Sequence, residues 1–354
     1  MGKDYKYLVC TRCFTYNHAH YIVNAMNGFT IQETSFPVIT LIVDDASTDG
    51  EPEVIQQYLE EYFQEPYRKE ETDYAQIICA KHKTNVNCEF VVILLKFNHY
   101  RKKSKKSYIS EWWDHAKYIA LCEGDDYWIA PDKLENQVRF LEANPEYSMS
   151  HTNFSIFREN QNKLIVDELY NNRIKEMNID GIVKPESIIH GYTIQTATVV
   201  FRRDLKNQMV LNDPFLYSGN FMMGDTQLWF GLNMLGKIHF DERRMAVYRK
   251  HDNSATMKTS FKKRMRFSLS CWELNYYLAN NYDFSIKEKE RISKEFGKRL
   301  AIYRLLQPSY HSIIENVFPL PVTEENNFLL LLEEYWAFLK YKMKSVLYSL
   351  RKAL

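Results

Sequence analysis

The chain has 354 residues and a hydrophobic fraction of 45%, which is enough for one large α/β domain and an additional region. Its 46 basic and 45 acidic residues give a net charge of +1. This balance argues against a dedicated nucleic-acid binder, because such proteins carry a strong basic excess. With 11 glycines and 10 prolines, the composition also argues against collagen-like or disordered structure.

The cysteines indicate a reducing environment. Their scatter through predicted strands and loops gives no disulfide framework; they are Cys10, Cys13, Cys79, Cys88, Cys122 and Cys271. The spacing of Cys10 and Cys13 is that of redox and zinc motifs, but no second pair completes a metal site. We therefore predict two small apolar strand residues.

No targeting segment is evident. The first residues lack the apolar stretch of a signal peptide. No run reaches the roughly 18 to 20 apolar residues that a membrane-spanning helix needs. We expect a cytoplasmic protein, and peripheral contact with the inner face of the membrane remains open.

The N-terminal part alternates predicted strands and helices. Continuous apolar runs predict strands over 7–13 and 37–43, and helical spacing predicts helices over 19–31 and 53–63. This order is typical of a parallel sheet covered on both faces. Ligands bind such sheets at the carboxyl ends of the strands. The polar clusters at 15–17 and 44–49 both follow strands, so we expect them on one edge.

The middle of the chain continues this pattern less regularly. Residues 64–90 are polar and carry no clear assignment, and 96–106 form a basic loop. Pro131 occupies a favourable first-turn position of a helix. The other predicted elements are strands over 90–95, 118–122, 148–157 and 196–201 and a helix over 224–235.

After residue 260 the strand signals end and long helical patterns begin. We predict a catalytic domain over 1–255 and a C-terminal α-helical region over 256–354. The last helix, 326–354, alternates apolar and basic residues, which suits an anionic membrane surface. Packing on the catalytic domain, or on a second subunit in a homodimer, is the alternative.

Three acidic residues lie within four positions after an apolar strand, at Glu123, Asp125 and Asp126. Ionising all three is costly unless a cation neutralises them. Carboxylate oxygens favour Mg²⁺ or Mn²⁺, and such an ion could stabilise a departing diphosphate. A solvated turn that caps the next helix is the alternative.

Three segments occur in the order of the motifs of family 2 glycosyltransferases, and the chain resembles that family over roughly residues 5–255. The segments are Phe14-Thr15-Tyr16-Asn17, Val43-Asp44-Asp45-Ala46-Ser47-Thr48-Asp49-Gly50 and Glu123-Gly124-Asp125-Asp126-Tyr127-Trp128. The resemblance implies the GT-A fold, a Rossmann-like, mostly parallel sheet flanked by helices. It also implies an inverting, metal-assisted transfer of sugar from a nucleotide-diphosphate donor, expected to be a UDP-sugar. The acceptor would be a hydroxyl of a glycan or lipid-linked molecule in polysaccharide biosynthesis.

The resemblance also implies roles for single residues around the donor. Thr15, Tyr16 and Asp45 would contact the nucleotide base and ribose, and Ser47 belongs to the same motif. Glu123-Gly124-Asp125 stands where the family has Asp-x-Asp, so Asp125 would bind the metal. The first acid here is Glu, which we expect to contact the ribose or a metal-bound water, and Asp126 would orient the loop or the donor sugar.

Three further residues complete the expected site. Asp225 opens a helix and resembles the family's general base, which takes the proton of the acceptor hydroxyl; a helix-capping role is the alternative. His251 lies in a segment that resembles the family's closing loop, where a histidine joins the metal or the diphosphate, although a surface loop would explain it as well. Lys106, in the basic loop, could neutralise the diphosphate, bind an acidic acceptor or simply be solvated.

Two other functions are alternatives to this one. A sugar-phosphate nucleotidyltransferase also uses acids and a metal, but it would have a glycine-rich loop after the first strand, and Phe14-Thr15-Tyr16-Asn17 contains no glycine. A degenerate, inactive assembly partner is disfavoured because the acids at Asp45, Asp125 and Asp225 are intact.

Overall fold

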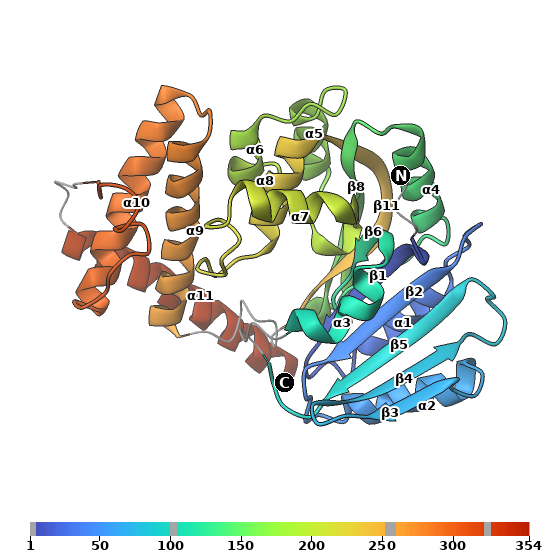
Figure 1. Cartoon of the computed structure of the whole chain (residues 1–354). Coiled ribbons are helices and arrows are strands. Elements are labelled where there is room, and N and C mark those ends of the chain that lie inside the picture. Colours follow the sequence, from blue (N-terminus) through green and yellow to red (C-terminus); the bar gives the residue numbers. More distant parts are fainter. Residues whose placement is uncertain (1–4, 100–104, 252–259, 322–326, 354) are drawn as a thin grey trace. The chain divides into compact units, whose positions relative to one another are not determined.

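The computed structural model describes residues 5–99, 105–251, 260–321 and 327–353. The chain divides into two compact units (Figure 1). The first consists of Met1–Asn212 and Leu228–His251, and the second of Asp213–Gln227 and Asp252–Leu354.

The first unit is built on one 11-stranded sheet. Its central strands, in spatial order, are β5 (Cys88–Leu95), β2 (Val38–Asp44), β1 (Tyr7–Thr15) and β6 (Ala116–Leu121), and all four are parallel. Each is a nearly continuous buried apolar run, as expected for strands covered on both faces. The predicted α/β class, with a mostly parallel sheet flanked by helices, is confirmed.

Strands of more polar sequence extend the sheet on both sides. Beyond β5 lies β4 (Ala75–Lys81), which is antiparallel to β5. The charged edge strand β3 (Arg68–Glu71) follows and is antiparallel to β4. Beyond β6 the order is β10 (Val199–Arg202), β8 (Tyr147–Arg158), β11 (Lys237–Lys250) and β7 (Tyr127–Trp128), and β9 (Lys163–Ile165) pairs with β8. Sequence patterning did not predict β11, whose register shifts at its charged segment Asp241–Arg244.

Helices cover the two faces of the sheet. Side chains of α1 (Ile22–Thr30), α2 (Glu51–Tyr62) and α4 (Lys133–Ala143) share one apolar core with β1 and β2. On the opposite face, Trp113 of α3 (Lys105–Trp113) lies 5.6 Å from the guanidinium carbon of Arg12. Cys10 and Cys13 are buried free thiols of β1, as predicted.

The start of α4 corrects one expectation. Pro131 precedes the helix, which begins at Lys133 after the capping position Asp132. The carbonyl of Pro131 accepts a hydrogen bond of 2.8 Å from the backbone N–H of Glu33. The proline therefore joins the connection between β7 and α4 to the segment after α1.

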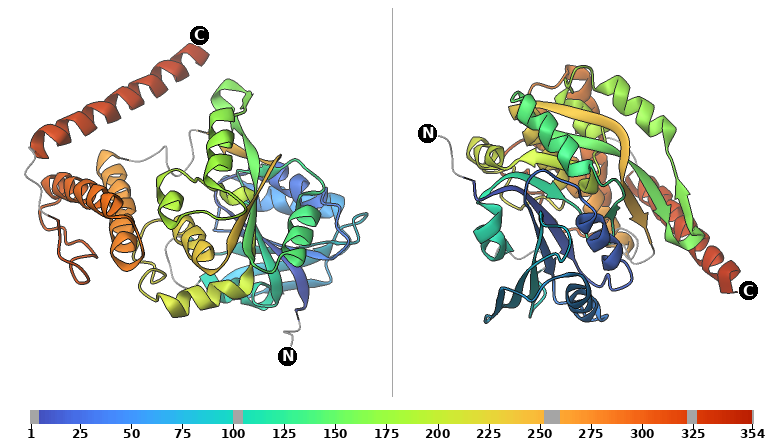
Figure 2. Two further views of the ribbon diagram at one scale, coloured as in Figure 1. Left: turned by 90° about the horizontal axis from the view of Figure 1, so that it is seen from above. Right: turned by 90° about the vertical axis from the view of Figure 1, so that its right-hand side faces the viewer.

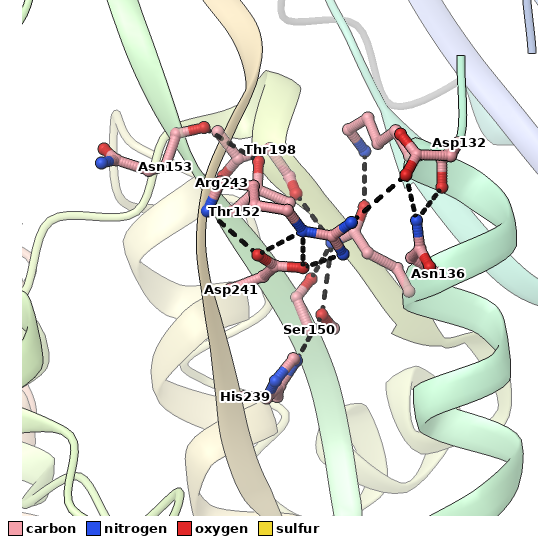
Figure 3. Close-up of polar contacts among 11 residues, drawn as sticks. Asp132, Asn136, Ser150, Thr152, Asn153, Thr198, His239, Asp241 and Arg243 are labelled. Carbon is pink, nitrogen blue, oxygen red and sulfur yellow. Dashed lines mark hydrogen bonds and ion pairs between the residues drawn. The ribbon is translucent and has the colours of Figure 1, made fainter. Parts of the chain in front are cut away.

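A polar network connects α4 to β8, to Thr198 in the turn just before β10, and to β11 (Figure 3). Gln137 donates to the carbonyls of Ser150 (2.9 Å) and Thr198 (3.0 Å), and Arg243 bridges Asp132 and Asp241. Lys133 is completely buried, with Nζ 2.8 Å from Gln137 Oε1. Burial lowers the pKa of Lys133 to about 7.

The remaining helices of the first unit follow β9 and β10: α5 (Glu168–Met177), α6 (Pro185–His190) and α7 (Arg203–Asn212). One helix, α8 (Asp225–Leu235), begins in the second unit and continues in the first.

The regular secondary structure in the described residues of the second unit is helical. It contains α9 (Phe261–Asn281), α10 (Ile286–Leu306) and α11 (Asn327–Ala353), and α9 and α10 lie side by side (Figure 1). Ser260 and Ser285 cap α9 and α10 with their hydroxyl groups. Within the described ranges, no helix is long and apolar enough to cross a bilayer.

Candidate metal and nucleotide site

Three loops meet at the carboxyl ends of the central strands. The backbone N–H of Asp45 donates to the carbonyl of Thr15 (3.0 Å), and the N–H of Gly124 donates to the carbonyl of Phe14 (3.1 Å). These bonds continue the β1–β2 and β1–β6 ladders past the ends of the strands. The polar clusters at 15–18, 44–49 and 123–126 therefore lie together on one edge of the sheet.

Gly124 allows the closest of these approaches. A Cβ at this position would lie 2.1 Å from Thr15 Oγ1 and 3.2 Å from His18 Nδ1. Any side chain here would push the β1 loop away from the β6 loop. The glycine of the acidic motif thus sets the distance between two loops.

Three potential metal ligands converge beside Gly124. His251 Nε2 lies 3.1 Å and His18 Nε2 lies 3.9 Å from Asp125 Oδ2. The ligand atoms of these three residues are within 4.8 Å of one another. The structure brings together Asp125 and His251, the two predicted ligands, and adds His18.

His18 is oriented by the residues behind it. Its Nδ1 is 3.2 Å from Thr15 Oγ1, whose hydroxyl donates to the carboxyl of Glu51. With that proton directed at Glu51, the Thr15 oxygen accepts from Nδ1–H, and Nε2 keeps its lone pair. Burial lowers the pKa of His18, which favours the neutral imidazole that binds metals.

The resulting arrangement suits a cation. The unprotonated Nε2 of His18 faces a carboxylate oxygen, and two acceptors at 3.9 Å gain no hydrogen bond from each other. Burial raises the pKa of Asp125, but the hydrogen bond from His251 and the nearby histidines outweigh it and leave this pKa below its usual value. Two imidazoles and an ionised carboxylate fit Mn²⁺ better than Mg²⁺, which prefers oxygen ligands alone.

Asp126 is not among these three ligands and instead holds the end of β11. Its Oδ1 accepts from the backbone N–H of Arg249 at 2.8 Å, and Arg249 Nε donates to the carbonyl of Asp125 at 3.0 Å. The two contacts clamp the acidic turn to β11 two residues before His251. Burial, and then the charge of Asp125, raise the pKa of Asp126 well above its usual value.

Arg249 is itself fixed from several sides. It is buried, pairs with Glu159 at 2.6 Å and donates to Asn24 Oδ1 at 2.9 Å. Its guanidinium also lies over the rings of Tyr21 (4.9 Å) and Tyr127 (5.2 Å). A guanidinium with this many partners acts as a positioning residue for the turn.

Glu51 joins the loops after β1 and β2. It is completely buried, and its Oε2 accepts from the His18 N–H (2.8 Å) and the Ser47 hydroxyl (2.9 Å). Burial raises its pKa to about 7, although the bonds from Thr15, His18 and Ser47 act in the opposite direction. The Ser47 oxygen also accepts from the Asn17 N–H at 2.8 Å, so Thr15 and Ser47 both serve to tie the loops together.

The other predicted donor contacts differ in exposure. Asp45 is buried, and its Oδ1 accepts from the His99 N–H at 2.6 Å. Tyr16 is 45% exposed, which leaves its ring open to a ligand. Glu123 is partly exposed, 3.7 Å from the guanidinium of Arg12.

Two predicted residues are not placed in this group. The side chain of Lys106 lies outside the described part of the structure. Asp225 is the exposed first residue of α8, its Oδ1 accepts from the Thr226 N–H at 2.7 Å, and it belongs to the second unit. Its role as a general base stays a prediction.

Sequence reasoning missed His18, Glu51 and Arg249 as site residues. His18 carried a usable signal, because it follows β1 on the edge that was predicted to bind the ligand. Glu51 lies two residues before the predicted start of its helix, at 53. Arg249 lies in a strand that was not predicted.

Comparisons with known proteins bear on the fold. No model of a known protein family matches the chain. Uncharacterized proteins of Mycobacterium tuberculosis and Mycobacterium bovis are 28% identical over 237 residues, which is 67% of this chain and 57% of theirs. The matched segment therefore spans little more than half the length of these relatives.

Two solved structures are similar to this one. S. aureus TarS 1-349 in complex with UDP has a TM-score of 0.49 at 14% identity, covering 87% of this chain and 77% of that chain. A mannosyltransferase from Pyrobaculum calidifontis, in complex with GDP-Man and Mn²⁺, has a TM-score of 0.50 at 13% identity. That match covers 98% of this chain and 85% of the other. The chain thus shares its fold with a mannosyltransferase.

Proposed function

We propose that this protein is a metal-dependent, inverting glycosyltransferase of the family 2 type. It would move a sugar from a nucleotide-diphosphate donor to an acceptor hydroxyl. The observation that carries the proposal is the convergence of His18, Asp125 and His251 from three separate elements at the edge where such a sheet binds nucleotides. The exposed ring of Tyr16 beside this group offers a stacking surface for the base.

In this mechanism, His18, Asp125 and His251 would hold a divalent cation, whose charge would offset that of the diphosphate leaving group. Asp225 would accept the proton of the acceptor hydroxyl while that oxygen attacks the anomeric carbon. The bond from this carbon to the diphosphate breaks on the opposite face, so one displacement inverts the configuration. Asp126, Glu51 and Arg249 would keep the three ligands in place.

The donor and acceptor are part of the proposal. We expect a UDP-sugar as donor and a glycan or lipid-linked hydroxyl as acceptor, in polysaccharide biosynthesis. Because the mannosyltransferase of similar fold was solved with GDP-Man, a donor panel should include GDP-sugars and dTDP-sugars as well.

Titration calorimetry with Mn²⁺ tests the metal site directly. We expect His18→Ala and His251→Ala each to weaken Mn²⁺ binding by about a hundredfold or more. Loss of a residue that only hydrogen-bonds to a metal ligand already weakens binding about tenfold to a hundredfold. His20→Ala is the matched control, because His20 lies two residues from His18 in the same loop and is exposed. If the His18 variant binds Mn²⁺ as tightly as the His20 variant, His18 is not a ligand.

A second experiment tests the chemistry. With Mn²⁺ and each donor, release of free nucleotide diphosphate reports on transfer to water or acceptor. Asp225→Asn should slow this release by about 10² to 10⁴ without weakening Mn²⁺ binding, as removal of a general base does. Release of pyrophosphate from a nucleoside triphosphate and a sugar phosphate would point to a nucleotidyltransferase. If no donor is turned over, the remaining alternative is that the protein is a non-catalytic assembly partner.

A further inference from the structure

The C-terminal helix α11 (Asn327–Ala353) exposes apolar side chains. Phe328 is 61% exposed and Trp336 is 55% exposed. Other large apolar residues on the helix that are exposed to a similar extent are Leu329, Leu332, Tyr335 and Met343. The spacing of 328, 332, 335, 336, 339 and 343 places them on one side of a helix. We call these residues, with Leu329, the α11 stripe.

The α11 stripe is not the side that contacts α10. A groove between the two helices is lined on the α11 side by two acidic residues, one alanine and one leucine, namely Glu333, Glu334, Ala337 and Leu330. Glu334 forms an ion pair with Arg299 of α10. A helix that packed on its own unit for stability would place its apolar side inward, and α11 does the reverse. Tyr335 of the stripe and Phe338 contact the neighbouring α9, at Phe261.

Charge distinguishes the possible partners of this stripe. The sequence of α11 holds five basic and two acidic residues, whereas the whole chain has a net charge of +1. The ammonium of Lys340 lies 5.6 Å from the ring of Trp336, so a cation flanks the aromatic centre of the stripe. Two copies of this basic helix packed against each other would repel, while an anionic surface would neutralise the charge.

The composition of the stripe matches a lipid interface. Trp and Tyr concentrate where hydrocarbon meets head groups, and Lys can keep its charge at the head groups while its carbon chain lies along apolar surface. In the sequence, apolar residues continue with the same spacing at Val346, Leu347 and Leu350. No described helix has the length and hydropathy to cross a bilayer, so α11 fits a helix that lies in the interface.

We propose that α11 binds the surface of an anionic lipid bilayer, with the α11 stripe in the interface and Lys340 at the head groups. This inference rests on the second unit alone and does not depend on the proposed reaction. Binding would hold the protein at a membrane, where lipid-linked acceptors reside.

Vesicle flotation with the full chain tests the proposal. We expect binding to vesicles of phosphatidylcholine with about one-third phosphatidylglycerol and at least roughly tenfold weaker binding to phosphatidylcholine alone. High salt should weaken binding to the anionic vesicles. The double variant Leu332→Glu/Trp336→Glu should lose about tenfold or more in affinity. The control is Ile286→Glu, because Ile286 is a single apolar residue of the same unit that is 77% exposed.

A second pair of variants separates charge from folding. Lys340→Glu should weaken binding to anionic vesicles, whereas Lys340→Arg should retain it, and neither alters the apolar stripe. Failure of the wild-type chain to bind anionic vesicles would overturn the proposal. A lipid-free dimer that Leu332→Glu/Trp336→Glu converts to monomers would also overturn it, because the stripe would then be covered by a second copy.

Discussion

The two units depart from the usual distribution of side chains in opposite directions. In the first, carboxyl, imidazole and guanidinium groups such as Glu51, His251 and Arg249 are buried beside the ends of β1, β2, β6 and β11. In the second, α11 leaves large apolar side chains such as Trp336 exposed. Both arrangements cost stability unless something compensates.

The compensation differs between the two regions. Glu51, Arg249 and Asp126 each bond to a segment remote in sequence, so each fixes the position of another loop. The α11 stripe fixes little within the chain, because α11 meets α10 through its other side. Changes to buried polar groups should therefore alter stability or site geometry, and changes to the stripe should alter only encounters with something outside the chain.

Replacing Lys133 should have the largest effect on stability. Burial disfavours its charged form, and no carboxyl group offsets this by raising its pKa. The pKa is about 7 in the folded chain and 10.5 when exposed. Below pH 7 the folded and the unfolded chain both bind the proton, so the folded chain bears the full free-energy cost of burying the charged ammonium. Between about pH 7 and 10.5 only the unfolded state binds it, so the penalty shrinks as the pH rises.

Lys133→Met should therefore stabilise the protein, and more at low pH than at high pH. Relative to wild type, the gain in unfolding free energy should fall by about 2 kcal/mol between about pH 6 and pH 8.5. Part of the gain is offset because Gln137 Oε1 loses its hydrogen bond from Lys133. Urea denaturation at both pH values measures it, with Lys117→Met as control, since Lys117 lies near the surface and pairs with Glu142. An equal gain at both pH values would show that Lys133 does not titrate in this range.

Gly124→Ala should have a smaller effect on stability and a specific effect on the site. The added Cβ would collide with Thr15 and approach His18, so we expect a loss of about 1–3 kcal/mol together with weaker Mn²⁺ binding. Gly191→Ala is the control, because the nearest atom to its Cβ would be 3.7 Å away. Equal Mn²⁺ affinity in the two variants would mean that the distance between the β1 and β6 loops does not set the metal geometry.

The sequence predicted the elements whose own residues form a clear pattern, such as a continuous apolar run. Apolar runs identified β1, β2, β5 and β6, and the position of Asp125 after β6 identified the edge of the sheet. It failed where long-range packing decides the structure. The charged segment Asp241–Arg244 interrupts the apolar pattern of β11, so the sequence does not predict this strand. In the fold, β11 pairs with β8 on one side and β7 on the other.

The same distinction applies to the site. Asp125 and His251 could be predicted as ligands because each belongs to a segment that resembles a family motif. The roles of Glu51 and Arg249 depend on partners that are 33 and 124 positions away, at His18 and Asp125, and no local pattern encodes such pairs. Thr15 and Ser47 were expected to face the donor, yet their hydroxyls are bonded to Glu51.

Substitutions in the α11 stripe should have the smallest effect on stability. Leu332→Glu should change the free energy of unfolding by less than about 0.5 kcal/mol, because Leu332 is 48% exposed and Leu and Glu have similar helix propensities. Leu134→Ala shows what a buried leucine contributes, since Leu134 is completely buried in α4 and should cost about 2–5 kcal/mol. Both variants can be measured by urea denaturation without lipid. If Leu332→Glu destabilises the chain as much as Leu134→Ala, another part of the protein covers the stripe, and the contrast between the two units disappears.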